Sequence, residues 1–249
     1  MSGHSKWATI KRKKGALDTK RGKLFTKLIK EITVASRMAG GDVVGNPRLR
    51  KAVIDAKDLS MPAETIKRAV QRGNGEIEGV IYDEIIYEGT GPNGTLFLVE
   101  SLTDNKNRTV AEIRKVFERN NGLLGGGGTA AWAFDRKGLI MIAKTAATED
   151  QLMEIAVGNG ADDYTDMGED WQVVTPIPSL DPILKALEEA KIPVKSGNAG
   201  FVPKNKKEVA GRDAEVCLNL AEALDDHDDV QNVYTDFDIS EEEIAKLEA

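Results

Sequence analysis

The chain has 249 residues, of which 41% are hydrophobic, so it is long enough to form two or three domains with buried cores and is not intrinsically disordered. It begins with a polar, lysine-rich segment and has no run of about 20 apolar residues, which argues against a signal peptide and a membrane helix and favours a cytoplasmic protein. The single cysteine, Cys217, excludes an intrachain disulfide, and two histidines are too few for a zinc-type ligand set.

Charge is distributed unevenly along the chain. Residues 1–75 contain 18 lysines and arginines against 6 acids, a net charge of +12, whereas residues 76–249 contain 16 against 35, a net charge of −19. A basic part of this kind is suited to meet phosphate, and the acidic remainder would repel it.

The N-terminal part is predicted to be helical. Apolar residues recur at three- and four-residue steps over 18–40, 47–59 and 62–73, and Asn46 stands where the second helix needs an N-cap. No strand pattern occurs there, so we expect residues 1–77 to form a basic helical domain.

From residue 80 the pattern changes to the alternation that is typical of strands. We expect a first group of elements in the order strand 80–88, strand 95–102, helix 108–120 and strand 129–134. A second group follows after a turn at 135–138, with strand 139–143, helix 149–158, strands 161–166 and 171–175, helix 180–190 and strand 200–203. This βαββαβ order is the split pattern of a ferredoxin-like domain.

The last predicted elements are a helix at 212–224 and a strand at 230–237. Because they have no partners of their own, we expect them to rejoin the first group. The predicted fold class is therefore multidomain α+β: a helical bundle at 1–77, a mixed domain of 78–136 plus 207–249, and an inserted ferredoxin-like domain at 137–206. A linear third domain is the alternative.

Three motifs were considered as ligand sites. Gly89–Gly94 matches GxGxxG, but it lies between two strands and contains proline, so we interpret it as a hairpin turn rather than a dinucleotide site. The run Gly125–Gly128 is either a flexible connection or a contact loop, and no P-loop lysine follows it. The four aspartates around His227 lack the spacing of an EF-hand loop, and we interpret them as solvated acids in a turn.

The sequence offers little for catalysis. Only His4 and His227 could act as a histidine base, and neither accompanies a nucleophile motif. We therefore expect a protein that is not an enzyme and that uses no cofactor, metal or small-molecule substrate.

The residues that carry a family resemblance are spread over nearly the whole chain. They are the opening Gly-His-Ser-Lys-Trp-Ala-Thr-Ile-Lys at 3–11 with the basic positions up to 27, Asn-Pro-Arg-Leu at 46–49, Met-Pro at 61–62, Tyr-Glu-Gly-Thr-Gly-Pro at 87–92, Leu-Thr-Asp-Asn-Lys-Asn-Arg-Thr at 102–109, and the segment 125–137. On these the chain resembles the YebC family, also called PmpR-like. Its bacterial members are labelled probable transcriptional regulatory proteins, and its mitochondrial relatives are translational activators of cytochrome c oxidase. The resemblance implies three domains that act on gene expression without a cofactor.

Two versions of nucleic-acid binding stay open: a DNA-binding transcriptional regulator, and a ribosome- or mRNA-associated translation factor. The residues expected to contact nucleic acid are Lys6, Trp7, Lys11, Arg12, Lys13, Lys14, Lys20, Arg21, Lys23, Lys27, Lys30, Lys67, Arg68 and Arg72. The acidic domains would then present a surface to a protein partner.

Overall fold

A computed structural model describes residues 17–248 of the chain. The N-terminal part of this range is a bundle of three helices, α2 (Leu17–Ala39), α3 (Pro47–Asp58) and α4 (Ala63–Gly73). The Asn46 side chain accepts a hydrogen bond from the amide of Leu49 and so caps α3, as its sequence position predicts. Ile32, Leu49 and Ala56 are buried between the helices, so the apolar stripes predicted for this region do form its core.

A four-stranded sheet in the order β3-β1-β2-β9 forms the second part. Its strands are β1 (Asp83–Thr90), β2 (Leu96–Thr103), β3 (Leu123–Leu124) and β9 (Val230–Thr235). β1 and β2 form an antiparallel hairpin around the short 3-10 turn η1 (Pro92–Gly94), which confirms the hairpin interpretation of the GxGxxG match. β9 pairs with β2 although more than 120 residues separate them, so the end of the chain does return to this sheet.

Two helices, α5 (Lys106–Arg119) and α8 (Gly211–Asp225), cover one face of this sheet. Phe97 of β2 packs edge-on against Phe117 of α5, with ring centroids 5.9 Å apart, and both are fully buried with Leu220 of α8. The opposite face carries Leu98 and Tyr234, which pack against the beginning of the third part.

The third part is a second sheet in the order β5-β6-β4-β7, with antiparallel neighbours. Its elements are β4 (Phe134–Ala143), α6 (Glu149–Leu152) continued by the π-turn η3 (Met153–Val157), β5 (Asp163–Asp166), β6 (Asp170–Thr175), α7 (Ile177–Glu189) and β7 (Val194–Pro203). This order and direction are those of the ferredoxin-like split βαβ unit, as predicted. The chain ends with β8 (Lys207–Glu208), which pairs with β10 (Phe237–Asp238), and with α9 (Glu241–Glu248).

One boundary prediction was wrong. The turn expected at 135–138 is absent: β4 runs without interruption from Phe134, and the expected strand at 129–134 is mainly a loop that ends in the 3-10 turn η2 (Ala131–Ala133). The polar 135–138 segment is extended because β7 pairs with all of it, and β7 itself begins at Val194 rather than 200. Gly138 serves close packing here, since a Cβ atom would lie 2.7 Å from Thr175 Cγ2.

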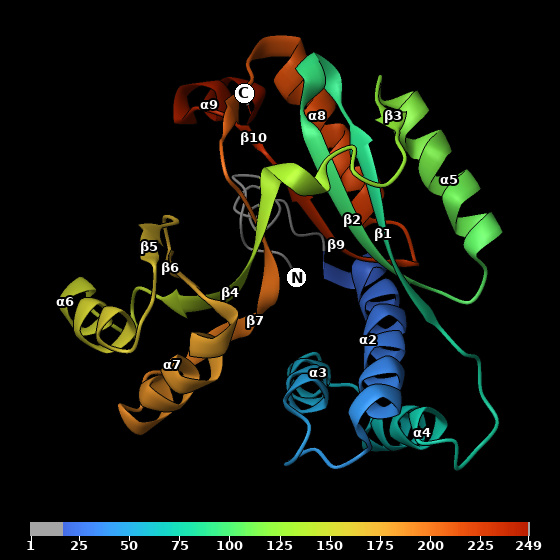
Figure 1. The fold of residues 1–249 in the computed structure, drawn as a ribbon, viewed down its shortest axis with the longest axis vertical. Helices are drawn as coiled ribbons and strands as arrows, with labels where there is room; N and C mark the ends of the chain where they lie inside the picture. Colours follow the sequence, from blue (N-terminus) through green and yellow to red (C-terminus); the bar gives the residue numbers. More distant parts are fainter. Residues whose placement is uncertain (1–16, 249) are drawn as a thin grey trace.

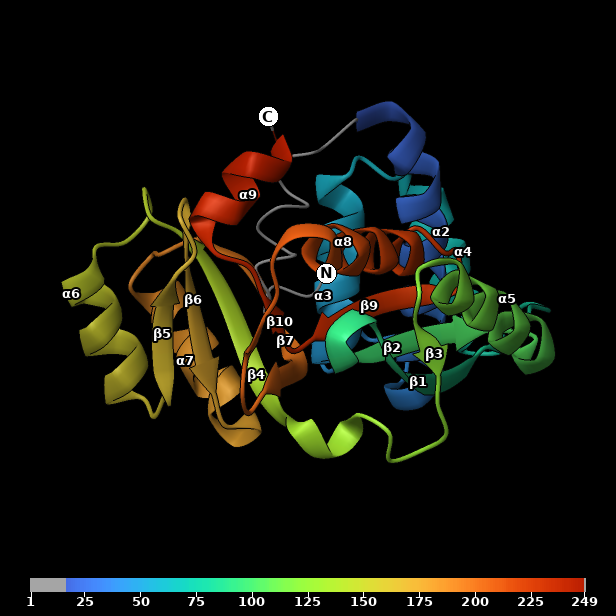
Figure 2. The same ribbon diagram turned by 90° about the horizontal axis from the view of Figure 1, so that it is seen from above.

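The three parts meet around the centre of the molecule, with the helical bundle below the β1-β2-β9 sheet and the third part to its side (Figure 1). Arg48 of α3 pairs with Glu31 of α2 and with Glu84 of β1, which ties the bundle to the sheet. In the view from above, α2 lies beside α8 (Figure 2). Their contact forms one wall of a groove described next.

Candidate nucleic-acid interface

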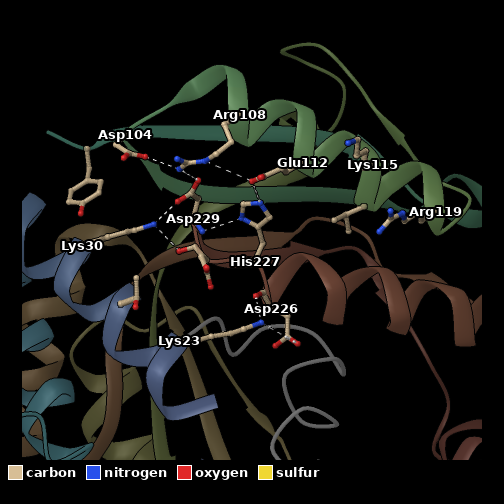
Figure 3. A pocket seen from close by; sticks show the side chains of 14 residues that line it. Lys23, Lys30, Asp104, Arg108, Glu112, Lys115, Arg119, Asp226, His227 and Asp229 are labelled. Carbon is tan, nitrogen blue, oxygen red and sulfur yellow. Dashed lines mark hydrogen bonds and ion pairs between the residues drawn. The ribbon is translucent and has the colours of Figure 1, made fainter. Parts of the chain in front are cut away.

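A groove of about 650 Å³ lies between α2, α5 and the turn that joins α8 to β9 (Figure 3). Charged side chains dominate its lining. The residues are Lys23, Thr26, Lys30, Tyr82, Asp104, Arg108, Glu112, Lys115, Val116, Arg119, Asp226, His227, Asp228 and Asp229. The lining contains both cations and carboxylates. What the groove can bind therefore depends on which of these groups are already paired with each other.

Three lysines of α2 form what we call the lysine clasp. Their spacing of four and three residues places them on one helical face. Their ammonium groups donate to backbone carbonyls at the end of α8 and in the following turn: Lys23 to Asp226 at 3.0 Å, Lys27 to Asp225 at 2.5 Å and Lys30 to Asp228 at 3.0 Å. The C-terminus of a helix exposes unsatisfied carbonyls and carries partial negative charge, so cations are stabilising there. The clasp thus fixes α2 against the turn between α8 and β9, beside the β3-β1-β2-β9 sheet.

Asp229 is the buried centre of the groove, with only 3% of its surface exposed. One carboxylate oxygen contacts Lys30 Nζ at 2.5 Å, and the other accepts from Arg108 Nη2 at 2.9 Å and Thr109 Oγ1 at 2.6 Å. Burial by itself raises the pKa of Asp229, but the hydrogen bonds from Lys30, Thr109 and Arg108 outweigh it and hold the pKa well below its ordinary value. The aspartates of this turn are therefore not all solvated acids, as the sequence suggested, because Asp229 is desolvated and paired.

His227 is held on both sides of its ring. Its Nδ1 lies 3.1 Å from the amide nitrogen of Asp229 and accepts from it, and its Nε2 lies 3.0 Å from a carboxylate oxygen of Glu112. With Nδ1 accepting, the ring proton belongs on Nε2, where it donates to Glu112.

Glu112, His227 and Asp229 bring three potential ligand atoms within 4.8 Å of one another. They do not suit a metal ion, because Lys30 and Arg108 already occupy the Asp229 oxygens and their positive charges would repel a dication. The Nδ1 of His227 is also engaged.

Within the described residues, two groups of exposed cations, on α5 and on α4, have no buried partner. Lys115 and Arg119 are exposed on α5 and form no ion pair with any residue that the structure describes. On α4, Lys67 and Arg72 are exposed and likewise unpaired within the described range, whereas Arg68 lies 3.3 Å from Glu64 in an exposed pair. An exposed ion pair of this kind contributes little to stability, so the arginine can readily leave Glu64 and bind another anion.

The structure thus divides the residues expected to contact nucleic acid. Lys6, Trp7, Lys11, Arg12, Lys13 and Lys14 lie outside the described residues, as do the side chains of Lys20 and Arg21. The other α2 lysines are brought together in the clasp, where they contact protein carbonyls, and Lys30 is buried at 7% exposure. The α4 cations stand apart from the groove lining and face solvent.

Sequence reasoning missed the groove residues of α5. Arg108, Lys115 and Arg119 lie at steps of seven and four residues, a helical spacing that places them on one face and that the sequence displays. No sequence signal marked Asp229 as buried among its exposed neighbours.

Comparison with known proteins places this architecture in a family. A model described as the TACO1/YebC N-terminal domain matches residues 5–76, and one described as the TACO1/YebC second and third domain matches residues 82–237. Probable transcriptional regulatory proteins from Chloroherpeton thalassium and Geobacter sulfurreducens are 55% and 52% identical, over 99% of this chain and 99% and 100% of theirs.

A crystal structure of a conserved hypothetical protein from Aquifex aeolicus has the same fold. It superimposes with a TM-score of 0.85 at 39% identity, over 90% of this chain and 93% of that one. Within the described range, no helix combines the length and apolar character needed to cross a membrane. The matches to both domain models and the full-length identities show that the chain belongs to the TACO1/YebC family, whose bacterial relatives are named probable transcriptional regulatory proteins.

Proposed function

We propose that the chain is a non-enzymatic, cytoplasmic regulator of gene expression that binds nucleic acid through its basic N-terminal domain. The observation that carries this proposal is the separation of charge, +12 over residues 1–75 against −19 over the remainder. Lysines and arginines that neutralise phosphates supply most of the affinity of such a contact. The proposal includes domains at 1–77, 78–136 plus 207–249, and 137–206.

The cations proposed to meet phosphate come from three stretches of the chain. They are the basic residues from Lys6 to Arg21, with Lys67, Arg68 and Arg72 on α4, and Lys115 and Arg119 on α5 as additions from the structure. The lysines of the clasp, Lys23, Lys27 and Lys30, act instead as positioning residues, because they contact the α8–β9 turn and hold the N-terminal bundle against it. The acidic surface of the later domains would repel nucleic acid and is proposed to face a protein partner.

The absence of catalysis is part of the proposal and is supported by the groove. A general base needs a free nitrogen or carboxylate within reach of a substrate proton. His227 uses both ring nitrogens, and Asp229 uses both oxygens. The groove therefore suits the binding of charge better than proton transfer.

The experiment is fluorescence anisotropy of the full-length protein with labelled double-stranded DNA and single-stranded RNA at several salt concentrations. We expect the triple variant Lys67→Gln, Arg68→Gln, Arg72→Gln to bind more weakly and to lower the log–log salt slope by about 2–3, close to one per lost phosphate contact. The matched control neutralises three exposed cations elsewhere, Lys185, Lys191 and Arg212, and should leave the slope unchanged. Equal effects of the two variants would contradict the assigned surface.

A transcriptional regulator and a translation factor would both contact phosphates, so charge alone does not separate them. The comparison of duplex DNA with single-stranded RNA in this experiment does. Tighter, sequence-dependent binding to duplex DNA supports a transcriptional regulator. Preference for single strands, with cosedimentation of the wild-type protein and ribosomes, supports the translation factor. No binding to either ligand at low salt would refute the proposal as a whole.

A further inference from the structure

Trp132 is a large aromatic side chain that the fold leaves exposed. It lies in η2, at the end of the loop that leads from β3 to β4 along the lower edge of the molecule in Figure 2, and 66% of its surface is exposed. Its indole Nε1 donates to the carbonyl of Thr129 at 3.1 Å. The polar atom of the ring is therefore satisfied locally, while much of the ring remains available for another aromatic surface.

A carboxylate from the neighbouring strand holds this turn in place. Glu88 of β1 accepts from the amides of Gly128 at 2.9 Å, Ala130 at 2.6 Å and Ala131 at 2.8 Å. Burial by itself raises the pKa of Glu88, but these three hydrogen bonds lower it overall, so the carboxylate stays charged at neutral pH. The backbone that carries Trp132 is thus fixed before any partner arrives, which lowers the entropic cost of binding.

One cation lies directly beside the turn that carries Trp132. The pairing of Phe134 with Pro203 brings the following residue, Lys204, next to this turn, whereas Lys137 and Lys206 are paired with Asp162 and Asp238. The nearest of these cations is Lys204, whose Nζ donates to the carbonyl of Trp132 at 2.8 Å and lies 3.7 Å from Asp135 in an exposed pair. An exposed indole beside a half-exposed lysine suits a partner that has flat rings and negative charge.

We propose that Trp132 stacks on an unpaired base of single-stranded nucleic acid, with Lys204 meeting the adjacent phosphate. This inference rests on the proposed function. It adds a second contact with nucleic acid, in the part of the chain whose net charge is negative. Stacking of bases on aromatic side chains, next to a cation that follows the backbone, is how single strands are bound with little sequence preference. A double helix keeps its bases paired and stacked, so it cannot use this contact.

The test measures binding of labelled single-stranded RNA and DNA oligonucleotides to full-length variants. Trp132→Ala and Trp132→Leu should weaken binding by about 5- to 150-fold, corresponding to ~1–3 kcal/mol for one stacked base, and Trp132→Phe should retain most of the affinity because it keeps a π face. Met153→Ala, which removes another exposed apolar side chain from η3, is the matched control and should have no effect. Binding to duplex DNA should not change in any of these variants.

A second readout reports on the ring itself. In a Trp7→Phe, Trp171→Phe background, Trp132 is the one remaining tryptophan, and its fluorescence should be quenched as the oligonucleotide is added. If Trp132→Ala binds the oligonucleotides as tightly as the wild-type protein does, the inference is overturned and the proposed function stands. Full affinity of Trp132→Leu would also overturn it, because an aliphatic contact would then suffice. Failure of the wild-type protein to bind any oligonucleotide would overturn both.

Discussion

Asp229→Asn is the substitution that best tests how the N-terminal bundle is held. The change keeps the shape of the side chain but removes the charge that compensates Lys30, whose surface is 7% exposed. Removing one partner of a buried ion pair costs about 3–5 kcal/mol, because the other charge stays desolvated. Arg108 adds little to this figure, since its side chain is 43% exposed and water can replace the lost contact. The asparagine oxygen can still accept one hydrogen bond, so we expect a loss of ~3 kcal/mol.

The assay is thermal unfolding by calorimetry, together with hydrogen exchange of α2 and β9. A loss of ~3 kcal/mol should lower the melting temperature by about 6–12 °C in a unit of 150–250 residues, and exchange should accelerate first at the contact between α2 and the α8–β9 turn. Asp226→Asn is the matched control in the same turn. Its carboxylate is 46% exposed and 4.0 Å from Lys23, so its loss should cost less than about 0.5 kcal/mol.

The pH dependence follows from the direction of the Asp229 pKa shift. The pKa is lower in the folded protein than in the unfolded chain, where it is roughly 3.9. The stabilisation is therefore fully present above the unfolded pKa and is lost as the pH falls through the folded pKa. We expect the stability gap between wild type and Asp229→Asn to be constant from pH 7 to 5 and to shrink below about pH 4. A gap no larger than that of Asp226→Asn, or one that grows in acid, would refute the reasoning.

Three further outcomes are expected. Gly73→Ala should destabilise the bundle by about 1–3 kcal/mol, because the new Cβ would lie 2.4 Å from the backbone oxygen of Thr33; an unchanged urea midpoint would contradict this. Glu88→Gln should speed amide exchange at Gly128 while leaving the sheet intact, since an amide has one acceptor oxygen for three donors; protection equal to wild type would contradict it. Cys217 is fully buried, and burial raises the pKa of its thiol, so it should react with Ellman's reagent only after unfolding; fast reaction of the native protein would show that the core opens.

Local patterns predicted most of the secondary structure because their causes are local. Helix periodicity, the Asn46 cap and the strand alternation around the Gly89–Gly94 turn depend on residues a few positions apart. The βαββαβ order was sufficient to predict the ferredoxin-like unit, whose strand order the structure shows. The 135–138 segment was misassigned because its extended form depends on pairing with β7, about 60 residues away.

The candidate site could be predicted from the sequence only in part. Net charge singled out the basic N-terminal region, but counting charges cannot say which lysines already have partners. Lys27 and Lys30 find theirs about 200 residues further along the chain, and the turn that carries Trp132 is held by Glu88 of β1, more than 40 residues earlier.

Residue type and short-range spacing were enough to predict the helices, most of the strands, the family resemblance and the separation of charge. Three features depend on the tertiary fold: Asp229 is buried against Lys30, three α2 lysines contact the α8–β9 turn, and Trp132 stays exposed beside Lys204. Burial and ion pairing are properties of surfaces brought together by folding, so they depend on contacts that no local pattern contains.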